Sequence, residues 1–199
     1  MRVYWQAQGP ETLPRPARVD HLLRSVLAPL VGRSAESLSF GRGIKGRPFL
    51  RHAGAPDFNL SDTAGGTVVA VCANGRVGVD LERLDRRPPV ARLAARWFSG
   101  VESRVLATME PEPARLAFLH LWTAKEASCK ATGTGIFGFL DQWQFDAASA
   151  APQLRAAPAD AGDPARWRFL RLAPAPGHTA ALALRDVAAT PLNGYRLVG

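Results

Sequence analysis

The chain has 199 residues, of which 47% are hydrophobic and 21% are charged. A chain of this length buries most of the surface that its unfolded form exposes, and this composition excludes an intrinsically disordered protein. The two cysteines, Cys72 and Cys129, are too few for a disulfide framework, which excludes a small secreted scaffold. We expect one domain, or two small lobes that share a core, in a reducing compartment.

The formal net charge of +8 predicts attraction to anionic partners. Nucleic acid, a diphosphate-bearing small molecule and an acidic protein all satisfy this charge, which does not distinguish among them. The first ten residues lack a basic start followed by an apolar stretch, and nowhere do eighteen apolar residues follow one another. We therefore predict a cytoplasmic protein without a membrane span.

The first half of the chain begins with a strand signal and a helix signal. Residues 3–5 predict a short strand, and residues 17–31 carry leucine and valine at helical spacing, with Gly32 as the terminator. Pro29 should kink the last turn of this helix or end it. Residues 41–56 are rich in glycine and proline and predict a loop.

A β-hairpin is predicted next. Residues 67–73 and 77–81 are two apolar runs, rich in valine, and Asn74-Gly75 lies between them. Asparagine followed by glycine supplies the positive φ angles of a tight two-residue turn, so we expect the two runs to pair with each other.

The second half predicts three helices and then two antiparallel strands. The helical ranges are 90–98, 101–107 and 113–131, and the strand ranges are 167–172 and 179–184. The third helix is the longest, with Pro113 tolerated in its first turn and Gly133 just beyond its end. Residues 147–164 have little apolar patterning and predict a surface connection.

The first motif with chemical meaning is Gly78-Val79-Asp80-Leu81-Glu82, in the second strand of the predicted hairpin. Because side chains alternate along a strand, Asp80 and Glu82 project from the same face. Two adjacent carboxylates repel each other unless a cation lies between them, and oxygen ligands of this kind suit Mg2+. For these five residues alone, the alternative is a solvated strand end that carries two ordinary acids.

The second motif lies on the longest predicted helix. Trp122, Glu126 and Lys130 are spaced four residues apart, so an aromatic ring, an acid and a base share one stripe of the helix. Such a stripe can face a site. The alternative is a surface Glu-Lys pair with a tryptophan buried at its edge, which contributes only a few tenths of a kcal/mol.

The third motif is Asn59-Leu60-Ser61-Asp62, preceded in the chain by Gly46-Arg47-Pro48. Its amide, hydroxyl and carboxylate groups stand next to a predicted strand, and Arg47 offers a fork of donors that matches phosphate geometry. The alternative is a turn made by the Asn and Asp side chains, with a solvated arginine nearby.

Together, these motifs resemble the surfactin-synthetase type of 4'-phosphopantetheinyl transferases over about residues 15 to 135. The matching elements, in chain order, are Gly46-Arg47-Pro48, Asn59-Leu60-Ser61, Gly78-Val79-Asp80-Leu81-Glu82, Arg96-Trp97-Phe98-Ser99 with Glu102, and Trp122-Thr123-Ala124-Lys125-Glu126 with Lys130. The order and spacing of the elements make the combined pattern specific to this family.

The resemblance implies an α+β fold with two similar lobes, each with a small antiparallel sheet and a long helix, related by a pseudo-twofold axis. The lobes would span about residues 1–85 and 86–199, with coenzyme A in the cleft between them. Asp80, Glu82 and Glu126 would hold one Mg2+.

The implied activity is transfer of the 4'-phosphopantetheine group of coenzyme A to a serine of an acyl or peptidyl carrier protein, releasing 3',5'-ADP. Glu126 would be the general base, with Glu82 as the rival for that role, and Lys130 would contact the coenzyme and stabilise the leaving group. Arg47 and Ser61 would bind the nucleotide end. The carrier would present an acidic helix to this basic chain, and a chain with both lobes can act as a monomer.

Two departures from the family pattern stand out. Many members have histidine after the serine of the Asn-x-Ser element, but this chain has Asp62, whose charge would repel phosphate unless the side chain turned away. The region before the first helix is also short, so a basic group that contacts the adenosine 3'-phosphate needs a substitute. Arg15 is the candidate for that contact.

Two other functions also fit parts of the sequence. A metal-dependent phosphohydrolase or nuclease could use the same three acids, although no further acid cluster is present for a second metal. A basic nucleic-acid-binding module would suit the charge, but no helix-turn-helix, zinc-ligand or aromatic-basic pattern is evident, so we expect no nucleic-acid partner.

Overall fold

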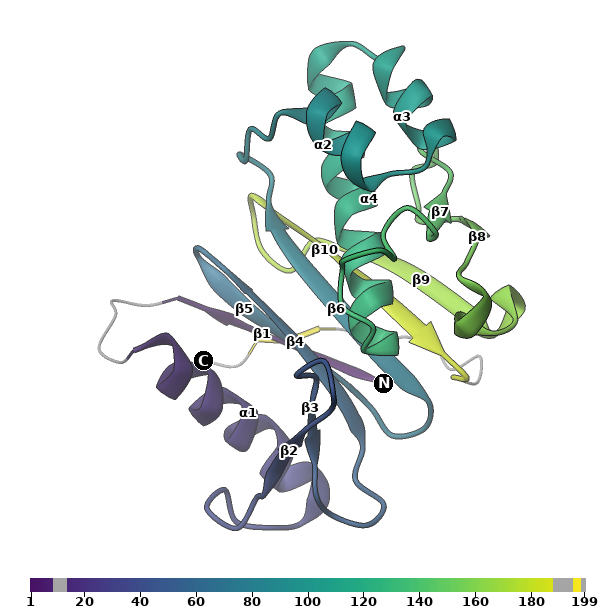
Figure 1. Ribbon diagram of the computed structural model, residues 1–199. Helices are drawn as coiled ribbons and strands as arrows, with labels where there is room; N and C mark the ends of the chain where they lie inside the picture. The colour runs from purple at the N-terminus through teal and green to yellow at the C-terminus, as the bar shows by residue number, and fades with distance from the viewer. Residues whose placement is uncertain (9–13, 188–194, 198–199) are drawn as a thin grey trace.

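The computed structural model describes residues 1–8, 14–187 and 195–197. Its core consists of a four-stranded and a three-stranded sheet, each packed against one long helix, and two short two-stranded sheets lie beside them (Figure 1). The helices are α1 (Arg15–Val31), α2 (Val90–Trp97), α3 (Gly100–Ala107) and α4 (Pro111–Thr132). The strands are β1 (Arg2–Ala7), β2 (Phe40–Arg42), β3 (Pro48–Leu50), β4 (Asp57–Thr63), β5 (Gly66–Cys72), β6 (Arg76–Arg83), β7 (Gln144–Phe145), β8 (Leu154–Ala156), β9 (Trp167–Leu172), β10 (His178–Arg185) and β11 (Tyr195–Leu197). Short 3-10 turns are η1 (Ala159–Ala161) and η2 (Pro164–Arg166). The predicted α+β class is confirmed.

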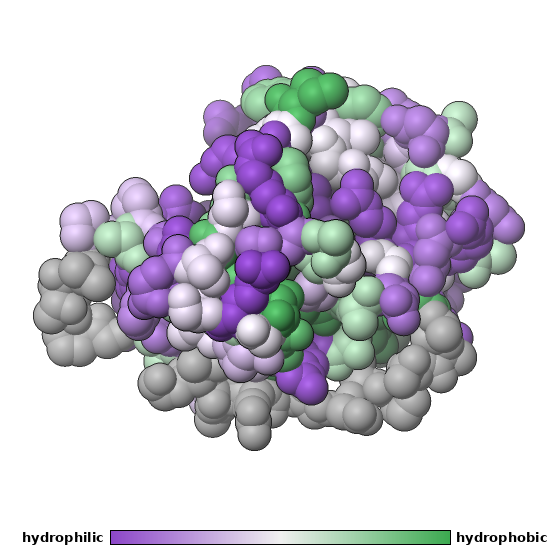
Figure 2. All heavy atoms as spheres, turned by 90° about the horizontal axis from the view of Figure 1, so that it is seen from below, coloured by the Kyte–Doolittle hydropathy of each residue, from purple (hydrophilic) through white to green (hydrophobic). Residues whose placement is uncertain are grey.

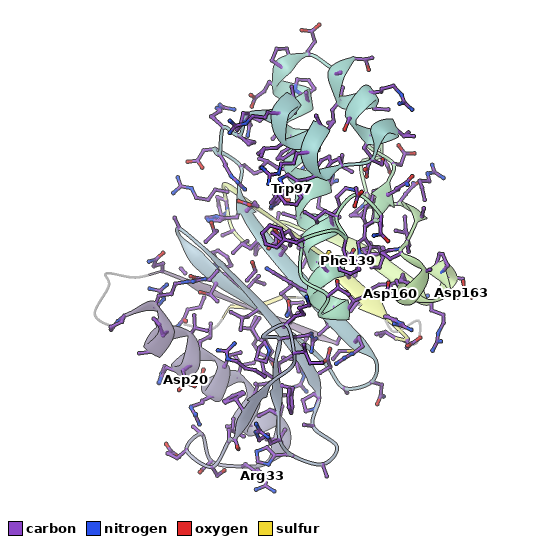
Figure 3. The ribbon with its side chains drawn as sticks, in the orientation of Figure 1. Asp20, Arg33, Trp97, Phe139, Asp160 and Asp163 are labelled. Carbon is purple, nitrogen blue, oxygen red and sulfur yellow. The ribbon has the colours of Figure 1, made fainter. Side chains whose placement is uncertain are left out.

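The first sheet has the order β11-β1-β5-β4, and helix α1 covers one of its faces. Leu22, Leu23 and Leu27 of α1 pack with Phe58 and Val69 of the sheet. Figure 3 shows Asp20 on the opposite side of α1 and Arg33 just beyond the end of the helix, both pointing outward. The helix begins at residue 15, and Pro29 lies inside its last turn without ending it.

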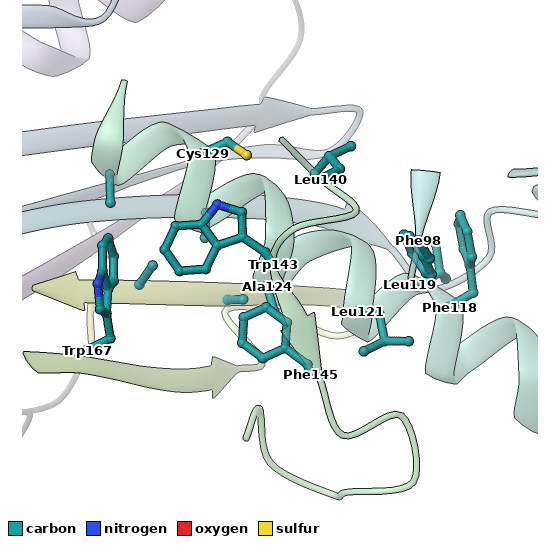
Figure 4. Packing of buried hydrophobic residues seen from close by; sticks show 14 of the residues in the cluster. Phe98, Phe118, Leu119, Leu121, Ala124, Cys129, Leu140, Trp143, Phe145 and Trp167 are labelled. Carbon is teal, nitrogen blue, oxygen red and sulfur yellow. The ribbon is translucent and has the colours of Figure 1, made fainter. Parts of the chain in front are cut away.

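The second sheet has the order β6-β10-β9, and α4 lies across it. The core between them is aromatic: Trp143 is fully buried and meets Trp167 edge to face with 4.9 Å between ring centroids. Figure 4 shows Trp143, Phe145 and Trp167 together beside α4. This helix ends as predicted, at Gly133, which takes the left-handed conformation with φ of 75°.

The predicted hairpin of residues 67–73 and 77–81 is wrong. Both runs are strands, but β5 pairs with β1 and β4, whereas β6 pairs with β10 in the other sheet. The two-residue hairpin turn needs a positive φ at both Asn74 and Gly75. Gly75 has a φ of 95°, but Asn74 does not have a positive φ, since Asp186 is the one non-glycine residue with a positive φ among the described residues. The chain instead crosses from one sheet to the other here.

Three segments contain more regular structure than their composition predicts. Residues 57–63, for which a turn was the alternative interpretation of the Asn-x-Ser motif, are strand β4, and the loop expected at 41–56 contains most of β2 and all of its partner β3. The connection at 147–164 contains β8, η1 and the first residue of η2. The division into lobes 1–85 and 86–199 stays a prediction, since β6 comes from the first range and pairs with β10 of the second.

Helices in the described part of the chain are too short or too polar to cross a lipid bilayer. Seen from below, apolar residues form small separate patches among hydrophilic ones (Figure 2).

Candidate functional site

Helix α4 lies directly on strand β6 at Gly78. A Cβ atom at this position would stand 1.9 Å from the carbonyl oxygen of Ala127 and 2.5 Å from the amide nitrogen of Ala131. Only glycine permits this approach of helix backbone to strand. The next residues of β6, Asp80 and Glu82, are thereby brought beside the same stretch of α4.

One stripe of α4 remains accessible where the helix crosses the sheet. Of residues 121–130, only three are not buried, and these are Trp122, Glu126 and Lys130. The stripe has the spacing expected from the sequence. Its acid and its base therefore face the open side of the seam between the two sheets.

Asp80, Ser61 and Lys130 form a hydrogen-bonded triangle across this seam. The Ser61 hydroxyl donates to Asp80 Oδ1 at 2.9 Å, and Lys130 Nζ lies 2.6 Å from the same oxygen and 2.9 Å from Ser61 Oγ. The three residues come from β4, β6 and α4. The site therefore joins the two sheets and the long helix at one point.

The three predicted acids share one electrostatic environment. Burial raises the pKa of Glu126 to about 7; the charge of Asp80 adds to the rise, Lys130 opposes it and Glu82 adds further. Burial also raises the pKa of Glu82, against the influence of Arg86. Asp80 thus raises the pKa of both glutamates, and Glu82 raises that of Glu126, as expected of carboxylates that lie close together.

Two basic side chains contact the acids in this structure. Lys130 pairs with Asp80, and Arg86 forms an ion pair with Glu82. Within the described ranges, no group of three or more His, Cys, Asp or Glu side chains is arranged closely enough to hold a metal ion. The donor chemistry suits a hard divalent cation, but binding requires the carboxylates to exchange these basic partners for the ion.

Arg47, whose predicted role in nucleotide binding stays a prediction, makes four internal hydrogen bonds in this structure. Its guanidinium forms two hydrogen bonds to Asp57, of 2.8 and 2.7 Å, and donates to the carbonyl oxygens of Val77 and Lys130, each at 2.8 Å. These bonds use four of its five N–H groups. Arg47 therefore connects β4, the start of β6 and the end of α4, and it fixes the backbone of Lys130.

The Asn-x-Ser element also bridges the two sheets. Asn59 is buried, and its side-chain oxygen accepts a 3.0 Å hydrogen bond from the backbone N–H of Val79. Strands β4 and β6 belong to different sheets and do not pair through their backbones, so the Asn59 side chain supplies a hydrogen bond between them. The sequence placed Asn59 in a functional motif, with a turn as the alternative, and did not predict this role.

Arg15 and Asp62, the two departures from the family pattern, pair with each other. Arg15 Nε lies 2.6 Å from Asp62 Oδ2, and Asp62 also accepts one hydrogen bond from Thr67 and forms an ion pair with Arg18. The hydrogen bonds and positive charges outweigh burial and lower the pKa of Asp62. The contact of Arg15 with a 3'-phosphate stays a prediction, but the negative charge of Asp62 is neutralised.

A pocket of about 230 Å³ opens beside Lys130, between the β2–β3 segment and the end of α4. Its lining includes Lys45, Pro48, Asn59, Lys130, Gly133 and Ile136. The lining comes from the β2–β3 segment, β4 and the end of α4. The pocket thus borders the basic end of the accessible stripe.

The part of the chain that contains this site is similar to a known protein family. Residues 76–184, from the start of β6 to the end of β10, match the model of the 4'-phosphopantetheinyl transferase superfamily. The chain belongs to this superfamily. The match includes all three acids and Lys130.

Three bacterial relatives show how much of the chain is similar to other members of the family. The 4'-phosphopantetheinyl transferase HetI of Nostoc sp. is 32% identical over 82% of this chain and 67% of its own length. The protein slr0495 of Synechocystis sp. is 34% identical over 81% of this chain and 65% of its own, and a 4'-phosphopantetheinyl transferase of Bacillus subtilis is 30% identical over 62% and 54%. The chain thus spans a half to two thirds of the length of these relatives. The holo-[acyl-carrier-protein] synthase of Thermotoga maritima matches with a TM-score of 0.44 and 24% identity over 56% of this chain and 62% of that chain.

In this phosphopantetheinyl transferase family member, sequence reasoning missed a buried ion pair next to Glu126. Lys125 is fully buried; its ammonium lies 2.8 Å from Glu102, donates to the carbonyl oxygens of Leu140 and Trp143, and sits 4.8 Å from the ring centroid of Phe98. Burial lowers the pKa of Lys125, although Glu102 opposes the change. The network fixes the rotation of α4.

Glu102 completes this network from the first turn of α3. It accepts hydrogen bonds from the backbone and hydroxyl of Ser99 and from the backbone N–H of Phe145. It is thus the acid of a capping box and the counter-ion of Lys125 at once. The signal available in the sequence was Ser99 followed by Glu102 before an apolar run, which predicts the cap but not the ion pair.

Proposed function

We propose that the chain transfers the 4'-phosphopantetheine group of coenzyme A to a serine of an acyl or peptidyl carrier protein, releasing 3',5'-ADP. The observation that carries the proposal is the convergence of Asp80 and Glu82 from β6 with Glu126 and Lys130 from α4, where Gly78 seats the helix. Family membership adds support from the sequence.

Asp80, Glu82 and Glu126 are the residues that would hold Mg2+. When bound, the ion would neutralise charge on the diphosphate of the coenzyme and on the leaving phosphate. Lys130 and Arg86 would then be released from their carboxylate partners to face the phosphates. This exchange keeps the local charge balanced before and after the substrate binds.

Glu126 is our candidate for the group that accepts the proton of the carrier serine. It lies on the accessible stripe of α4, and Glu82 of β6 is the rival for this role. As the serine oxygen forms its bond to the β-phosphorus, the bond to the leaving 3',5'-ADP breaks, and Lys130 stabilises the departing phosphate. Ser61, which contacts both Lys130 and Asp80, would orient the nucleotide end.

The partner we propose is an apo carrier protein with an acidic recognition helix, in the cytoplasm. The net charge of +8 attracts such a helix at long range. The predicted site draws its residues from both sheets of one chain, so we propose that a monomer is active. Because surface attraction is screened by salt, the transfer rate should fall as ionic strength rises.

The deciding experiment is mass spectrometry of an apo carrier protein after incubation with coenzyme A, Mg2+ and this protein. We expect the carrier to gain one phosphopantetheine group with wild-type protein and to gain none with Asp80→Ala. Asp160→Ala is the matched control, because Asp160 is an exposed acid in η1 and contributes to neither sheet nor α4; Figure 3 shows it at the outer edge of the molecule. An unmodified carrier with the wild-type protein, or hydrolysis of coenzyme A without transfer, would contradict the proposal.

A further inference from the structure

A second cavity, of about 280 Å³, lies on the other side of α4 from the predicted catalytic residues. It is bounded by α4, by the segment that follows β7 and by β9, which Figure 1 shows on the same flank of the helix. The helix residues that line it are Pro113, Leu116, Ala117, His120, Leu121 and Ala124. His120 and Trp122 are two positions apart, hence separated by about 200° around the helix. The cavity is therefore distinct from the site at Glu126.

The cavity contains two basic side chains that have no acidic partner. Arg171 of β9 donates one hydrogen bond, to the carbonyl oxygen of Ala150, and forms no ion pair within the described ranges. His120 lines the same space. The acid in the lining, Asp146, is engaged elsewhere: it pairs with Arg155 at 2.6 Å and accepts a 3.0 Å hydrogen bond from the backbone of Ala148.

The pKa shifts of the two basic groups are consistent with the lack of an acidic partner. Burial lowers the pKa of Arg171, with no acid acting against it. Burial, together with the charge of Arg171, lowers the pKa of His120 to about 4. A half-buried guanidinium without a counter-ion has lost hydration that the protein does not replace, so an anion that enters the cavity would recover that loss.

The rest of the lining is apolar and gives the ligand its second feature. Met109, Leu116, Ala117 and Phe145 provide an aliphatic and aromatic wall beside the two basic groups. Inorganic phosphate would gain nothing from this wall. An anion with a short hydrocarbon chain would bury the chain against it, at about 0.8 kcal/mol for each methylene group.

We propose that this cavity binds a small organic monocarboxylate, with its carboxylate on Arg171 and His120 and its aliphatic chain on the apolar wall. Carboxylate and guanidinium match in charge and in planar geometry. The neutral His120 ring supplies one further N–H donor. No residue of the predicted transferase site takes part, so this proposal stands independently of the proposed function.

Isothermal titration with sodium butyrate tests the proposal, with sodium phosphate at the same ionic strength as the second arm. We expect one butyrate per chain, weaker binding of phosphate, and at least about tenfold weaker butyrate binding by Arg171→Met. Arg168→Met is the matched control, because Arg168 lies on the same strand, is exposed and does not line the cavity. It should bind butyrate as the wild type does.

A second variant tests the cavity without removing a charge. Ala117→Met places a longer side chain in the space, and we expect loss of butyrate binding with the circular dichroism spectrum unchanged. The His120 C2 proton should shift in NMR spectra as butyrate is added. Absence of binding to the wild-type protein, equal binding by Arg171→Met, or binding of phosphate as tight as that of butyrate would overturn the proposal.

Discussion

Lys125 Nζ lies 2.8 Å from Glu102 Oε2, and the two side chains are 0% and 1% exposed. The ion pair connects the middle of α4 to the N-terminus of α3, one residue away from Glu126. Removal of one member leaves the other charge buried without a counter-ion, which costs far more than the pair itself contributes.

We therefore predict that Lys125→Met lowers the free energy of unfolding by about 3–5 kcal/mol, measured by urea denaturation. The double variant Lys125→Met/Glu102→Leu should recover part of this loss, because it removes both charges. Lys45→Met, a change at an exposed lysine, serves as the control. A double variant less stable than Lys125→Met would contradict the role of the pair.

Gly78→Ala should destabilise the contact between α4 and β6. The new methyl group meets helix backbone, which cannot move aside as a flexible side chain could, so we expect a loss of at least about 1–3 kcal/mol in the free energy of unfolding. Carrier modification should fall with it. Gly43→Ala is the control, since its Cβ would stand 3.7 Å from the nearest backbone atom. Equal stability of the two variants would show that the helix can shift away.

Glu126→Gln should lower kcat for carrier modification by about 10²–10⁴-fold if this carboxylate accepts the serine proton. Glu82→Gln should have a smaller effect, because Glu82 would serve as a metal ligand and not as the base, and the amide oxygen of glutamine can still coordinate the ion. Glu36→Gln, at an exposed acid after α1, controls for the loss of a negative charge. The ranking of the two kcat values decides between the candidates, and a larger loss in Glu82→Gln would assign the proton to Glu82.

Arg47→Met should act on stability before it acts on coenzyme binding. The change leaves the Asp57 side chain, which is only 12% exposed, without its two-bond partner, and we expect a loss of about 2–4 kcal/mol in the free energy of unfolding. Asp57→Asn should lose less, because an amide oxygen still accepts from Arg47. If Arg47→Met kept its stability and only raised KM for coenzyme A, the nucleotide role predicted from the sequence would be restored.

The pH dependence of stability should carry a contribution from His120. The folded-state pKa of about 4 lies below the ordinary 6.5, so the unfolded chain binds more protons between these values. The contribution is therefore fully present above pH 6.5 and is lost as the pH falls towards 4. The charged groups that face the ring are Arg171 and Asp146, which stay ionised in this window.

We expect this contribution to be about 1–2 kcal/mol after allowance for the partial exposure of the ring. Urea denaturation of wild type and His120→Gln across pH 4.5–7 measures it, and the variant should show a flatter profile. His52→Gln, at a histidine outside the cavity, is the control. Parallel profiles for wild type and His120→Gln would contradict the prediction.

Periodicity and caps in the sequence predicted the long helices well. The spacing of Leu22, Leu23 and Leu27 defined α1, and Gly32 and Gly133 ended α1 and α4 where the structure has their left-handed caps. Such signals are local, since a cap and an apolar stripe depend on residues within one or two turns. Strands β9 and β10 were predicted for a related reason, because their apolar runs stand between polar segments.

Features that depend on distant partners could not be predicted. The valine runs of β5 and β6 read as a hairpin because nothing local reveals that β10, about a hundred residues later, is the partner of β6. Strand β4 was not predicted, because Asn59 and Ser61 are polar and interrupt the apolar pattern, although both are buried at the seam. Similarly, the acid and base stripe was predicted from spacing, whereas the internal role of Arg47 required knowledge of Asp57 and of the end of α4.

Strand β6, from residues 1–85, completes the sheet that is otherwise built from residues 86–199. Neither range should therefore fold stably without the other. A fragment of residues 86–199 would expose the edge of β10 that β6 normally occupies, and a fragment of residues 1–85 would carry β6 without its neighbour. Proteolytic nicking near Asp85 should therefore yield pieces that remain associated, and each piece produced separately in cells should precipitate.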